Sequence, residues 1–344
     1  SNPIALNSEG DIDMDTALAY ETDYEAMKAY FESREVDPTK PVSENAQTNE
    51  KTMEVWNYLR SVYGKQVITC QQMMGNECYE DLVFYNATND LTAMKGYDFI
   101  FCTGSYHSDD MIDEAIEWSK ESGGLCAFTW HWNVPKDIDN PEGGYAFYTN
   151  EITNFSQVNA VTPGTKEYET IIHDIDLIAT KIQRMESEGV TILFRPLHEA
   201  SGAWFWWGLQ GRDSATNEVF QKLWYMIYDR LENYHKLTNI IWVWNGQDKD
   251  WYPGDEYVDI IGEDIYPGEH VYTSQISKYL NAATNYSTGH KLVYMTENGC
   301  VFDPELAKRD GAMWGMWCTW QGEFVVKSMS IITLDETYTE EEML

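Results

Sequence analysis

The sequence predicts an α/β protein that folds as one closed (β/α)8 barrel, the TIM-barrel architecture. Eight short apolar runs, rich in β-branched and aromatic residues, alternate with segments whose apolar residues recur at helical spacing. The composition does not shift along the 344 residues, and this is an ordinary length for a single barrel. No glycine-rich turn follows the first run, which disfavours the alternative, an open doubly wound sheet.

The first part of the chain, residues 1–48, is predicted to be a lead-in that packs on the outside of a barrel formed by residues 49–344. The lead-in is acidic and is interrupted by Pro38 and Pro41, so we expect a helix followed by an irregular segment. From Thr52 the apolar residues return at helical spacing, and Gly64 ends this helix.

The remaining elements alternate between strands and helices. We expect strands at residues 66–70, 98–102, 125–130, 191–195, 240–244, 258–262, 292–296 and 312–317. We expect helices at residues 52–63, 109–120, 166–187, 215–234, 273–286 and 304–309. A long loop at residues 131–162 follows the third strand and is crowded with tyrosine and phenylalanine.

The segment around the fourth strand carries the densest group of chemically active side chains. Its apolar run is typical of a strand buried on both faces, and Pro196 prevents further pairing inside a sheet. Arg195, His198 and Glu199 lie at this strand end, and three tryptophans follow within four residues. Titratable groups beside aromatic surface are typical of an active site on such a scaffold. The structural alternative is an ion pair beside a tryptophan-rich part of the core.

The charge of the chain excludes whole classes of partner. There are 57 acidic and 23 basic residues, and the formal net charge is -34. Nucleic acid would be repelled, and an anionic membrane surface or a polyanionic substrate is disfavoured. Neutral substrates remain, and the 14% of aromatic residues suits sugars, because flat aromatic rings stack on the C–H faces of sugar rings.

Cysteines and hydropathy bear on the compartment. The six cysteines show no metal-type spacing, and Cys70 could pair with Cys78 in an oxidising compartment. No apolar run approaches membrane-spanning length. The chain starts at Ser1 and not at methionine, which is compatible with a removed signal peptide. We expect a secreted, periplasmic or cell-surface protein that is a monomer and uses no cofactor.

Two glutamates stand out among the residues at the predicted strand ends. Glu199 follows the fourth strand and Glu297 the seventh, and of the other glutamates only Glu263 has a similar placement. Carboxyl ends of barrel strands converge on one mouth, so this pair is expected to face across it. Two facing carboxyl groups are what glycosidic bond hydrolysis requires, and a separation of about 5–5.5 Å would make one of them a nucleophile.

Less specific interpretations of these residues stay open. His198 and Glu199 do not begin a zinc motif of the HExxH type, because Gly202 occupies the last position, so we expect no metal. His131, between two tryptophans, could be a hydrogen-bonded core histidine. About half of the clustered tryptophan rings are expected to be structural, because alternate strand residues point to opposite faces.

The residues around Glu199 carry a resemblance to a known family. Arg195-Pro-Leu-His-Glu199, followed by Gly202 and by Trp-Phe-Trp-Trp-Gly at residues 204–208, resembles the signature of glycoside hydrolase family 26, whose members are mainly β-mannanases. The segments at residues 129–135, 259–266 and 295–299 agree with it. The resemblance covers about residues 64–321.

The resemblance implies a retaining hydrolase of β-1,4-mannosidic bonds in mannan, galactomannan or glucomannan. It implies that Glu199 is the acid/base, that Glu297 is the nucleophile and that Tyr266 hydrogen-bonds the nucleophile. From the strand ends and the resemblance together, we expect substrate contacts from His131, Trp132, Arg195, His198, Trp204, Asp264, Tyr266 and Trp317.

Some positions depart from the family pattern and leave the substrate open. Ala200-Ser201, Cys70-Gln71 and Glu263 replace residues that are more usual in the family, and all are expected around the bound sugars. Mixed-linkage β-glucan and β-1,3-xylan are therefore alternative substrates, and a non-catalytic glycan-binding barrel is an alternative function. Whether the loop at residues 131–162 closes one end of the cleft, and so decides between exo and endo attack, does not follow from the sequence.

Overall fold

The computed structural model describes residues 1–75, 79–208, 217–288 and 291–325, and it has the expected TIM-barrel fold. Eight parallel strands close in the order β1-β10-β9-β8-β7-β6-β3-β2. They are β1 (Ile68–Gln72), β2 (Met94–Asp98), β3 (Leu125–Thr129), β6 (Ile192–Arg195), β7 (Ile240–Trp244), β8 (Ile260–Ile265), β9 (Leu292–Asn298) and β10 (Met316–Thr319). A small antiparallel pair, β4 (Val134–Pro135) and β5 (Tyr145–Ala146), lies in the long loop after β3.

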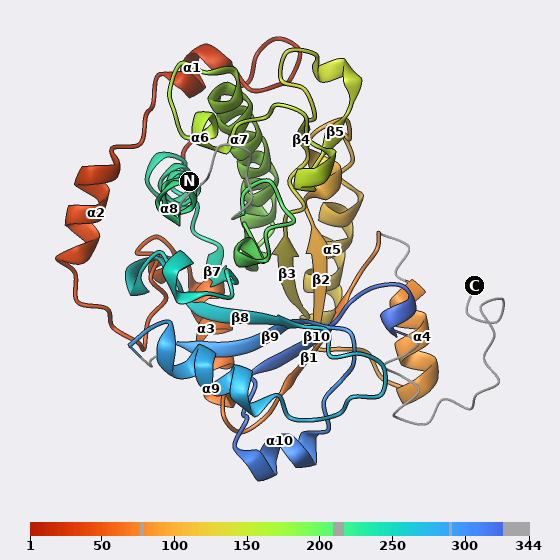
Figure 1. The fold of residues 1–344 in the computed structure, drawn as a ribbon. Coiled ribbons are helices and arrows are strands. Elements are labelled where there is room, and N and C mark those ends of the chain that lie inside the picture. The colour runs from red at the N-terminus through yellow and green to blue at the C-terminus, as the bar shows by residue number, and fades with distance from the viewer. Residues whose placement is uncertain (76–78, 209–216, 289–290, 326–344) are drawn as a thin grey trace.

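Helices surround the barrel (Figure 1). The α-helices are α1 (Met14–Leu18), α2 (Tyr24–Glu32), α3 (Glu50–Val62), α4 (Tyr79–Thr88), α5 (Asp110–Ser122), α6 (Gln157–Ala160), α7 (Lys166–Ser187), α8 (Asn217–Asp229), α9 (Ile276–Asn285) and α10 (Pro304–Asp310). A π-helical turn, η6 (Arg230–Tyr234), continues α8. Short 3-10 turns are η1 (Ala46–Thr48), η2 (Ile100–Cys102), η3 (Pro141–Gly143), η4 (Thr149–Glu151), η5 (Ala200–Gly202), η7 (Lys249–Trp251) and η8 (Asp255–Tyr257).

The core forms on both sides of the closed sheet. Successive side chains of a strand point to opposite faces, so each strand contributes to two apolar clusters. Leu193 and Val243 belong to the cluster inside the barrel, whereas Phe194 and Trp242 belong to the larger cluster beneath the helices. This alternation decides which polar residues at the strand ends face the mouth.

The second strand was predicted in the wrong place. Residues 98–102 were expected to form it, but β2 is Met94–Asp98 and Ile100–Cys102 is a 3-10 turn. Lys95, the second residue of β2, interrupts the apolar run by which a strand is recognised in a sequence. The Lys95 ammonium is buried 2.5 Å from Asp81 and 2.9 Å from Glu114, so its charge is neutralised inside the fold.

The lead-in runs over the outside of α7 and α8. Arg230 is fully buried, and its guanidinium donates to the carbonyl oxygens of Ala17 at 3.1 Å and Tyr20 at 3.0 Å. The Thr22 hydroxyl donates to Asp229 at 2.8 Å, again between the lead-in and the α8 region. These contacts bind the first residues of the chain to the back of the barrel.

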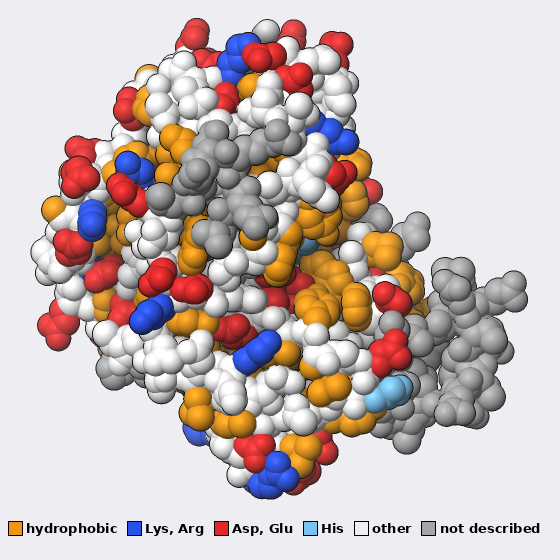
Figure 2. Space-filling view, in the orientation of Figure 1, with side chains coloured by type: hydrophobic (Ala, Val, Ile, Leu, Met, Phe, Trp, Pro, Cys, Tyr) orange, Lys and Arg blue, Asp and Glu red, His pale blue; other side chains and the backbone are white. Residues whose placement is uncertain are grey.

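The surface carries many acidic side chains (Figure 2), and the described cysteines are buried free thiols. In the part of the chain that the structure describes, no helix combines the length and the apolar character needed to cross a bilayer. Acidic side chains are spread over the face in Figure 2, in keeping with the net charge of -34. Cys70 is a buried free thiol whose partner across the β1–β10 ladder is Cys318. Cys78, its expected partner in an oxidising compartment, lies outside the described residues.

Candidate active site

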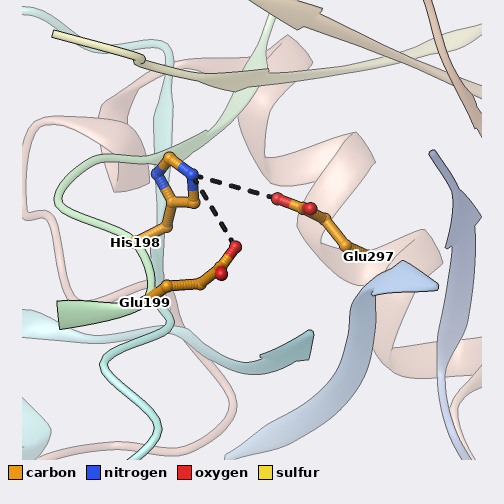
Figure 3. Close-up of side chains that lie close together, drawn as sticks. All are labelled: His198, Glu199 and Glu297. Atoms are coloured by element: carbon orange, nitrogen blue, oxygen red, sulfur yellow. Dashed lines mark ion pairs between the residues drawn. The ribbon is translucent and has the colours of Figure 1, made fainter. Parts of the chain in front are cut away.

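The two glutamates predicted from the strand ends lie face to face. Glu199 comes from the loop after β6, and Glu297 is the next-to-last residue of β9. One oxygen of each carboxyl group and a nitrogen of His198 all lie within 4.8 Å of one another (Figure 3). This separation is in the range of retaining glycosidases, in which the two carboxyl groups lie too close together for an attacking water to fit between one of them and a bound sugar.

Arg195 forms the floor beneath this pair. Its guanidinium lies 2.6 Å from Glu297 Oε2 and 2.9 Å from Asp264 Oδ2. The same group donates to Asn245 Oδ1 at 2.6 Å. Burial alone would lower the pKa of Arg195, but the Asp264 and Glu297 carboxylates outweigh burial and raise it, so Arg195 stays a permanent cation.

Glu297 is held on both of its oxygens. Arg195 donates to Oε2 at 2.6 Å, and the hydroxyl of Tyr266 donates to Oε1 at 2.5 Å. Burial and the nearby Glu297 carboxylate raise the pKa of Tyr266, so the phenol keeps its proton and remains a donor. Both hydrogen bonds favour the ionised carboxylate, which is the form a nucleophile needs.

The two carboxyl groups have unequal surroundings. Burial raises the pKa of both. For Glu199 the negative charges of Glu297 and Asp264 raise it further. For Glu297 the Asp264 charge also raises it, but the Arg195 cation and the Tyr266 hydroxyl oppose the increase. Glu199 therefore holds a proton while Glu297 is ionised, which is the division that an acid and a nucleophile require.

His198 lies between the carboxyl groups. Its Nε2 is 3.9 Å from Glu199 and 4.0 Å from Glu297 (Figure 3), and among the described residues it has no hydrogen-bond partner. Burial lowers the pKa of His198, and the Arg195 and His131 charges lower it further, so the imidazole is neutral. A neutral ring with a free nitrogen at this point is suited to bind a substrate hydroxyl.

The same three side chains have the donor set of a metal site, one imidazole and two carboxylates. The surroundings fit poorly, because both Glu297 oxygens already accept short hydrogen bonds from Arg195 and Tyr266. A guanidinium this close also repels a second cation. The geometry suits a proton shared among acids better than a bound metal ion.

His131 faces the site and is fixed by an aspartate. Its Nδ1 is 2.5 Å from Asp98 Oδ2, and its backbone N–H donates to Asp98 Oδ1 at 3.0 Å. The ring lies edge-on to His198 at 4.7 Å and beside Trp320 at 5.8 Å. Burial alone would lower the pKa of His131, but the Asp98 carboxylate outweighs burial and raises it.

The loop that carries Glu199 has a strained backbone. Leu197, Glu199 and Ala203 have φ angles of 55°, 55° and 71°, in the left-handed region that disfavours residues with a Cβ atom. Such conformations persist where the surroundings determine them, and they are concentrated at functional sites. Here the strain aims the Glu199 side chain toward Glu297 and away from the line of the strand.

Aromatic side chains line the cleft next to this loop. Trp204 is 44% exposed and Tyr148, from the long loop, is 42% exposed. They border a pocket of about 780 Å³ that is also lined by Thr149, Asn150 and Glu151. The two loops are joined by the Thr149 N–H, which donates to the Trp204 carbonyl at 2.8 Å. An open pocket with exposed rings is suited to sugar residues.

Comparison with known proteins decides the family. The model of glycosyl hydrolase family 26 matches residues 42–340. The chain belongs to glycosyl hydrolase family 26. Mannan endo-1,4-beta-mannosidase B of Piromyces sp is 36% identical over 284 residues, 80% of this chain and 47% of that protein. The Thermothelomyces thermophilus mannan endo-1,4-beta-mannosidase is 32% identical over 289 residues, 82% of this chain and 57% of that protein.

Solved structures give the same result for the family 26 barrel. A ruminal GH26 endo-beta-1,4-mannanase superposes with a TM-score of 0.75 at 29% identity, covering 90% of this chain and 72% of that one. The Podospora anserina GH26-CBM35 beta-(1,4)-mannanase gives 0.74 at 29% identity, covering 90% of this chain and 70% of that one. The chain spans about half the length of the Piromyces relatives.

Two tryptophans expected in the family 26 site lie elsewhere. Trp132 is 0% exposed, stacks on Trp130 at 3.8 Å and donates to Asp174 at 2.8 Å. Trp317 is buried in the outer cluster and packs against Phe84 of α4. Trp317 points outward because its neighbours in β10, Met316 and Cys318, point into the barrel.

The structure brings the other predicted residues together and adds some that the sequence did not reveal. Glu199, Glu297, Arg195, His198, Asp264, Tyr266 and His131 form one connected group, and Trp204 lies beside it. The ring of Trp320 lies 5.8 Å from that of His131, so Trp320 borders the site where Trp317 had been predicted to do so. Asp98, which holds His131, had been assigned to the start of a strand. No motif pointed to Gln247, whose side chain accepts a hydrogen bond from the backbone of Asp264.

Proposed function

We propose that the protein is a retaining glycoside hydrolase that cleaves internal β-1,4-mannosidic bonds in mannan, galactomannan or glucomannan. The observation that carries this proposal is the pair Glu199 and Glu297, whose carboxyl oxygens lie within 4.8 Å under unequal hydrogen bonding. The mannan endo-1,4-beta-mannosidase names of the relatives support the choice of substrate.

The first step forms a covalent bond to the sugar. Glu297, held ionised by Arg195 and Tyr266, attacks the anomeric carbon of the bound mannose. The bond from that carbon to the departing oxygen breaks, and Glu199 donates its proton to the oxygen. The leaving sugar chain departs as an alcohol, and a glycosyl ester of Glu297 remains.

The second step releases the sugar. The ester carries no negative charge, so the main charge that raises the pKa of Glu199 after burial is gone. Glu199, now ionised, removes a proton from a water molecule whose oxygen attacks the anomeric carbon. Glu297 departs as a carboxylate, and Glu199 holds a proton again. The configuration at the sugar is retained because it is inverted twice.

Three side chains around the acids bind and orient the sugar. Tyr266 shares its hydroxyl between Glu297 and the reacting ring, and the free Nε2 of His198 faces the space between the carboxyl groups. His131, oriented by Asp98, lies against His198 on the other side. Together they hold the anomeric carbon close to Glu297, and this proximity is a large part of the rate enhancement.

Endo attack is favoured by the pocket beside Trp204. It continues from the loop that carries the proton donor, and Tyr148 and Trp204 border it without closing it. A chain of sugars can therefore extend past the cleaved bond.

Every side chain of this site comes from one chain, so we propose that catalysis needs no partner subunit. A polymeric substrate also supports a secreted, periplasmic or cell-surface location.

The proposal is tested by Glu199→Ala and Glu297→Ala, with Glu263→Gln as the matched control. Glu263 lies on β8 but accepts a hydrogen bond from Tyr286 in the outer layer. Reducing-sugar release and product sizing are measured on mannan, galactomannan, glucomannan, lichenan and β-1,3-xylan. Each catalytic variant should lose about 10³-fold or more in kcat on mannan, whereas Glu263→Gln should stay near the parent.

The same panel distinguishes the rival functions. If reducing sugars are released faster from lichenan or from β-1,3-xylan than from mannan, that polymer is the substrate. Binding of mannan without any reducing ends would indicate a glycan-binding barrel. Near-normal turnover of mannan by Glu297→Ala would remove the nucleophile assignment.

A further inference from the structure

The turn after β7 holds the Glu199 segment from behind. The backbone N–H of Glu199 donates to the carbonyl oxygen of Asn245 at 2.7 Å, and that of Ser201 donates to Gly246 at 3.2 Å. The segment itself is strained, because Glu199 lies at a φ of 55°. A strained loop keeps its shape only when outside contacts fix it, and these two hydrogen bonds are such contacts.

The side chain of Gln247 anchors this turn to the next strand. Its Oε1 accepts from the backbone N–H of Asp264 at 2.8 Å and from Asn245 Nδ2 at 3.1 Å. Asn245 Nδ2 also donates to the Gly262 carbonyl at 3.1 Å. One amide oxygen therefore joins the turn after β7 to the end of β8.

Asp264 is the other half of the arrangement. Its carboxylate is held by Arg195 and by the hydroxyl of Thr296, which lies 2.6 Å away. After burial and Glu297, the Asp264 charge is a further cause of the raised pKa of Glu199. Gln247 contacts the backbone of Asp264 and, through Asn245, supports the backbone of Glu199. Gln247 thereby sets the separation of the Glu199 and Asp264 carboxyl groups.

We infer that Gln247 is a positioning residue for the proton donor Glu199, an inference that rests on the proposed function. Gln247 acts through Asn245 on the Glu199 backbone and through Asp264 on the Glu199 carboxyl group. Gln247 also lies at a φ of 63°, where glycine would be relaxed. The side chain is thus placed at this turn at the expense of backbone strain.

Gln247→Gly removes the amide while suiting the backbone. Two substrates are compared: mannopentaose, whose leaving oxygen needs a proton, and 2,4-dinitrophenyl β-mannobioside, whose leaving phenolate does not. The ratio kcat/KM covers only the steps up to the glycosyl-enzyme. We expect kcat/KM to fall about 10-fold to 100-fold on mannopentaose. On the dinitrophenyl glycoside we expect a change below about twofold.

Two further variants separate positioning from folding. Gln247→Glu keeps an oxygen acceptor in place, so it should recover most of the activity on mannopentaose. Its added negative charge favours the protonated Glu199, so the basic limb of the pH profile should move to higher pH. Gln275→Gly is the control for the backbone change, because Gln275 has a φ of 56° and its side chain donates to Thr273, two residues away in the sequence. It should match the parent on both substrates.

The possible outcomes distinguish the positioning role of Gln247 from the mannanase activity itself. Equal losses of Gln247→Gly on both substrates, or no loss on mannopentaose, would overturn the positioning role while leaving the mannanase proposal intact. The absence of recovery in Gln247→Glu would also count against it. A parent protein that cleaves neither mannopentaose nor the dinitrophenyl glycoside would instead defeat the proposed function.

Discussion

At the level of single residues, the site is a group of acids organised around one permanent cation. Arg195 contacts Asp264 and Glu297 directly, and Glu199 lies next to both acids. Three carboxyl groups near one guanidinium cannot all be ionised cheaply, because like charges in a buried site raise one another's pKa. The group with the weakest hydrogen bonding to its anion, Glu199, keeps the proton.

Asp98→Asn should alter the charge of His131 without moving its ring far. Asp98 is the reason that the pKa of His131 is raised although burial would lower it. Without the Asp98 carboxylate, the Glu297 charge alone opposes burial and the Arg195 charge, so the pKa of His131 should fall. We expect kcat/KM on mannopentaose to fall about 10-fold at neutral pH, and we expect the His131 C2 proton signal in NMR to titrate at lower pH.

Asp90→Asn is a suitable control for this change, because Asp90 is exposed and its carboxylate accepts from the N–H of the neighbouring Leu91. A His131 titration that is the same in Asp98→Asn and in the parent would show that Asp98 does not set the charge of the ring.

The sequence predicted the reacting residues better than the residues that hold them. Glu199, His198 and Glu297 follow recognisable strands, so their convergence follows from barrel geometry. Asp98 and Gln247 act through contacts between segments distant in sequence, and such pairings leave no local pattern. Trp317 was misplaced because the face that a strand residue occupies depends on a register of one residue, and Trp132 because it lies in the loop after β3, beyond the alternation of the strand.

At the level of elements, the loop after β6 is fixed by strain and close packing together. Gly202 lies directly beneath the Trp204 indole, and a Cβ atom built at position 202 would lie 2.1 Å from the ring. Gly208 is similarly confined, since its added Cβ would lie 2.5 Å from the Ala200 carbonyl oxygen. Glycines at these positions allow the loop to fold back on itself beside Glu199.

Gly202→Ala should therefore displace the Trp204 ring from the cleft wall. We expect the KM for mannopentaose to rise about 10-fold while kcat changes little, because a wall that binds the sugar chain contributes equally to ground and transition states. Steady-state kinetics on mannopentaose measure the change. Gly75→Ala is the control, since its added Cβ would meet no atom of the described residues within 4 Å.

A fall in kcat at unchanged KM in Gly202→Ala would place the effect on Glu199 and not on the aromatic wall. The same result in Gly75→Ala would point to a general response of the mouth to added methyl groups.

The elements themselves were predictable where their patterns were uniform. β7 and α7 follow continuous apolar or periodic runs and lie within a residue or so of the expected bounds. β2 was missed because Lys95 interrupts it, and its two carboxylate partners come from α4 and α5. The helix α4 was not predicted, and without it the partner of Lys95 at Asp81 had no place in the expected fold.

At the level of the whole molecule, a histidine joins the lead-in to the barrel. His173 of α7 lies 2.8 Å from Asp11 and 2.9 Å from Asp174. Although burial lowers the pKa of a histidine, these two carboxylates raise that of His173 to about 9. The folded pKa is above the unfolded value of about 6.5. The stabilisation is therefore complete below about pH 6.5 and is lost as the pH rises through about 9.

His173→Gln should lower the melting temperature at pH 6, and the difference from the parent should shrink by pH 10. Thermal unfolding followed by circular dichroism across this range measures it. His270→Gln is the control, because the His270 ring contacts the half-buried Tyr272 and no carboxylate among the described residues. A difference that stays constant from pH 6 to pH 10 would contradict the proposed ion pairs.

The barrel was predicted as a whole because its signal is distributed over many elements. The displacement of the second and eighth strands did not change the number of βα units, and closure follows from eight parallel strands with helices between them. The attachment of the lead-in could not be predicted, because it depends on single carbonyl oxygens at Ala17 and Tyr20 that meet Arg230.

Those carbonyl contacts have a practical consequence for anyone trimming the protein. The family match begins at residue 42, yet the buried guanidinium of Arg230, which pairs with Asp176, also donates to carbonyl oxygens at residues 17 and 20. A version cut at the edge of the match would uncover that cation, Asp229 and the apolar surface under Phe31. We expect it to be poorly soluble, so the cooperative unit starts well upstream of the boundary that homology draws.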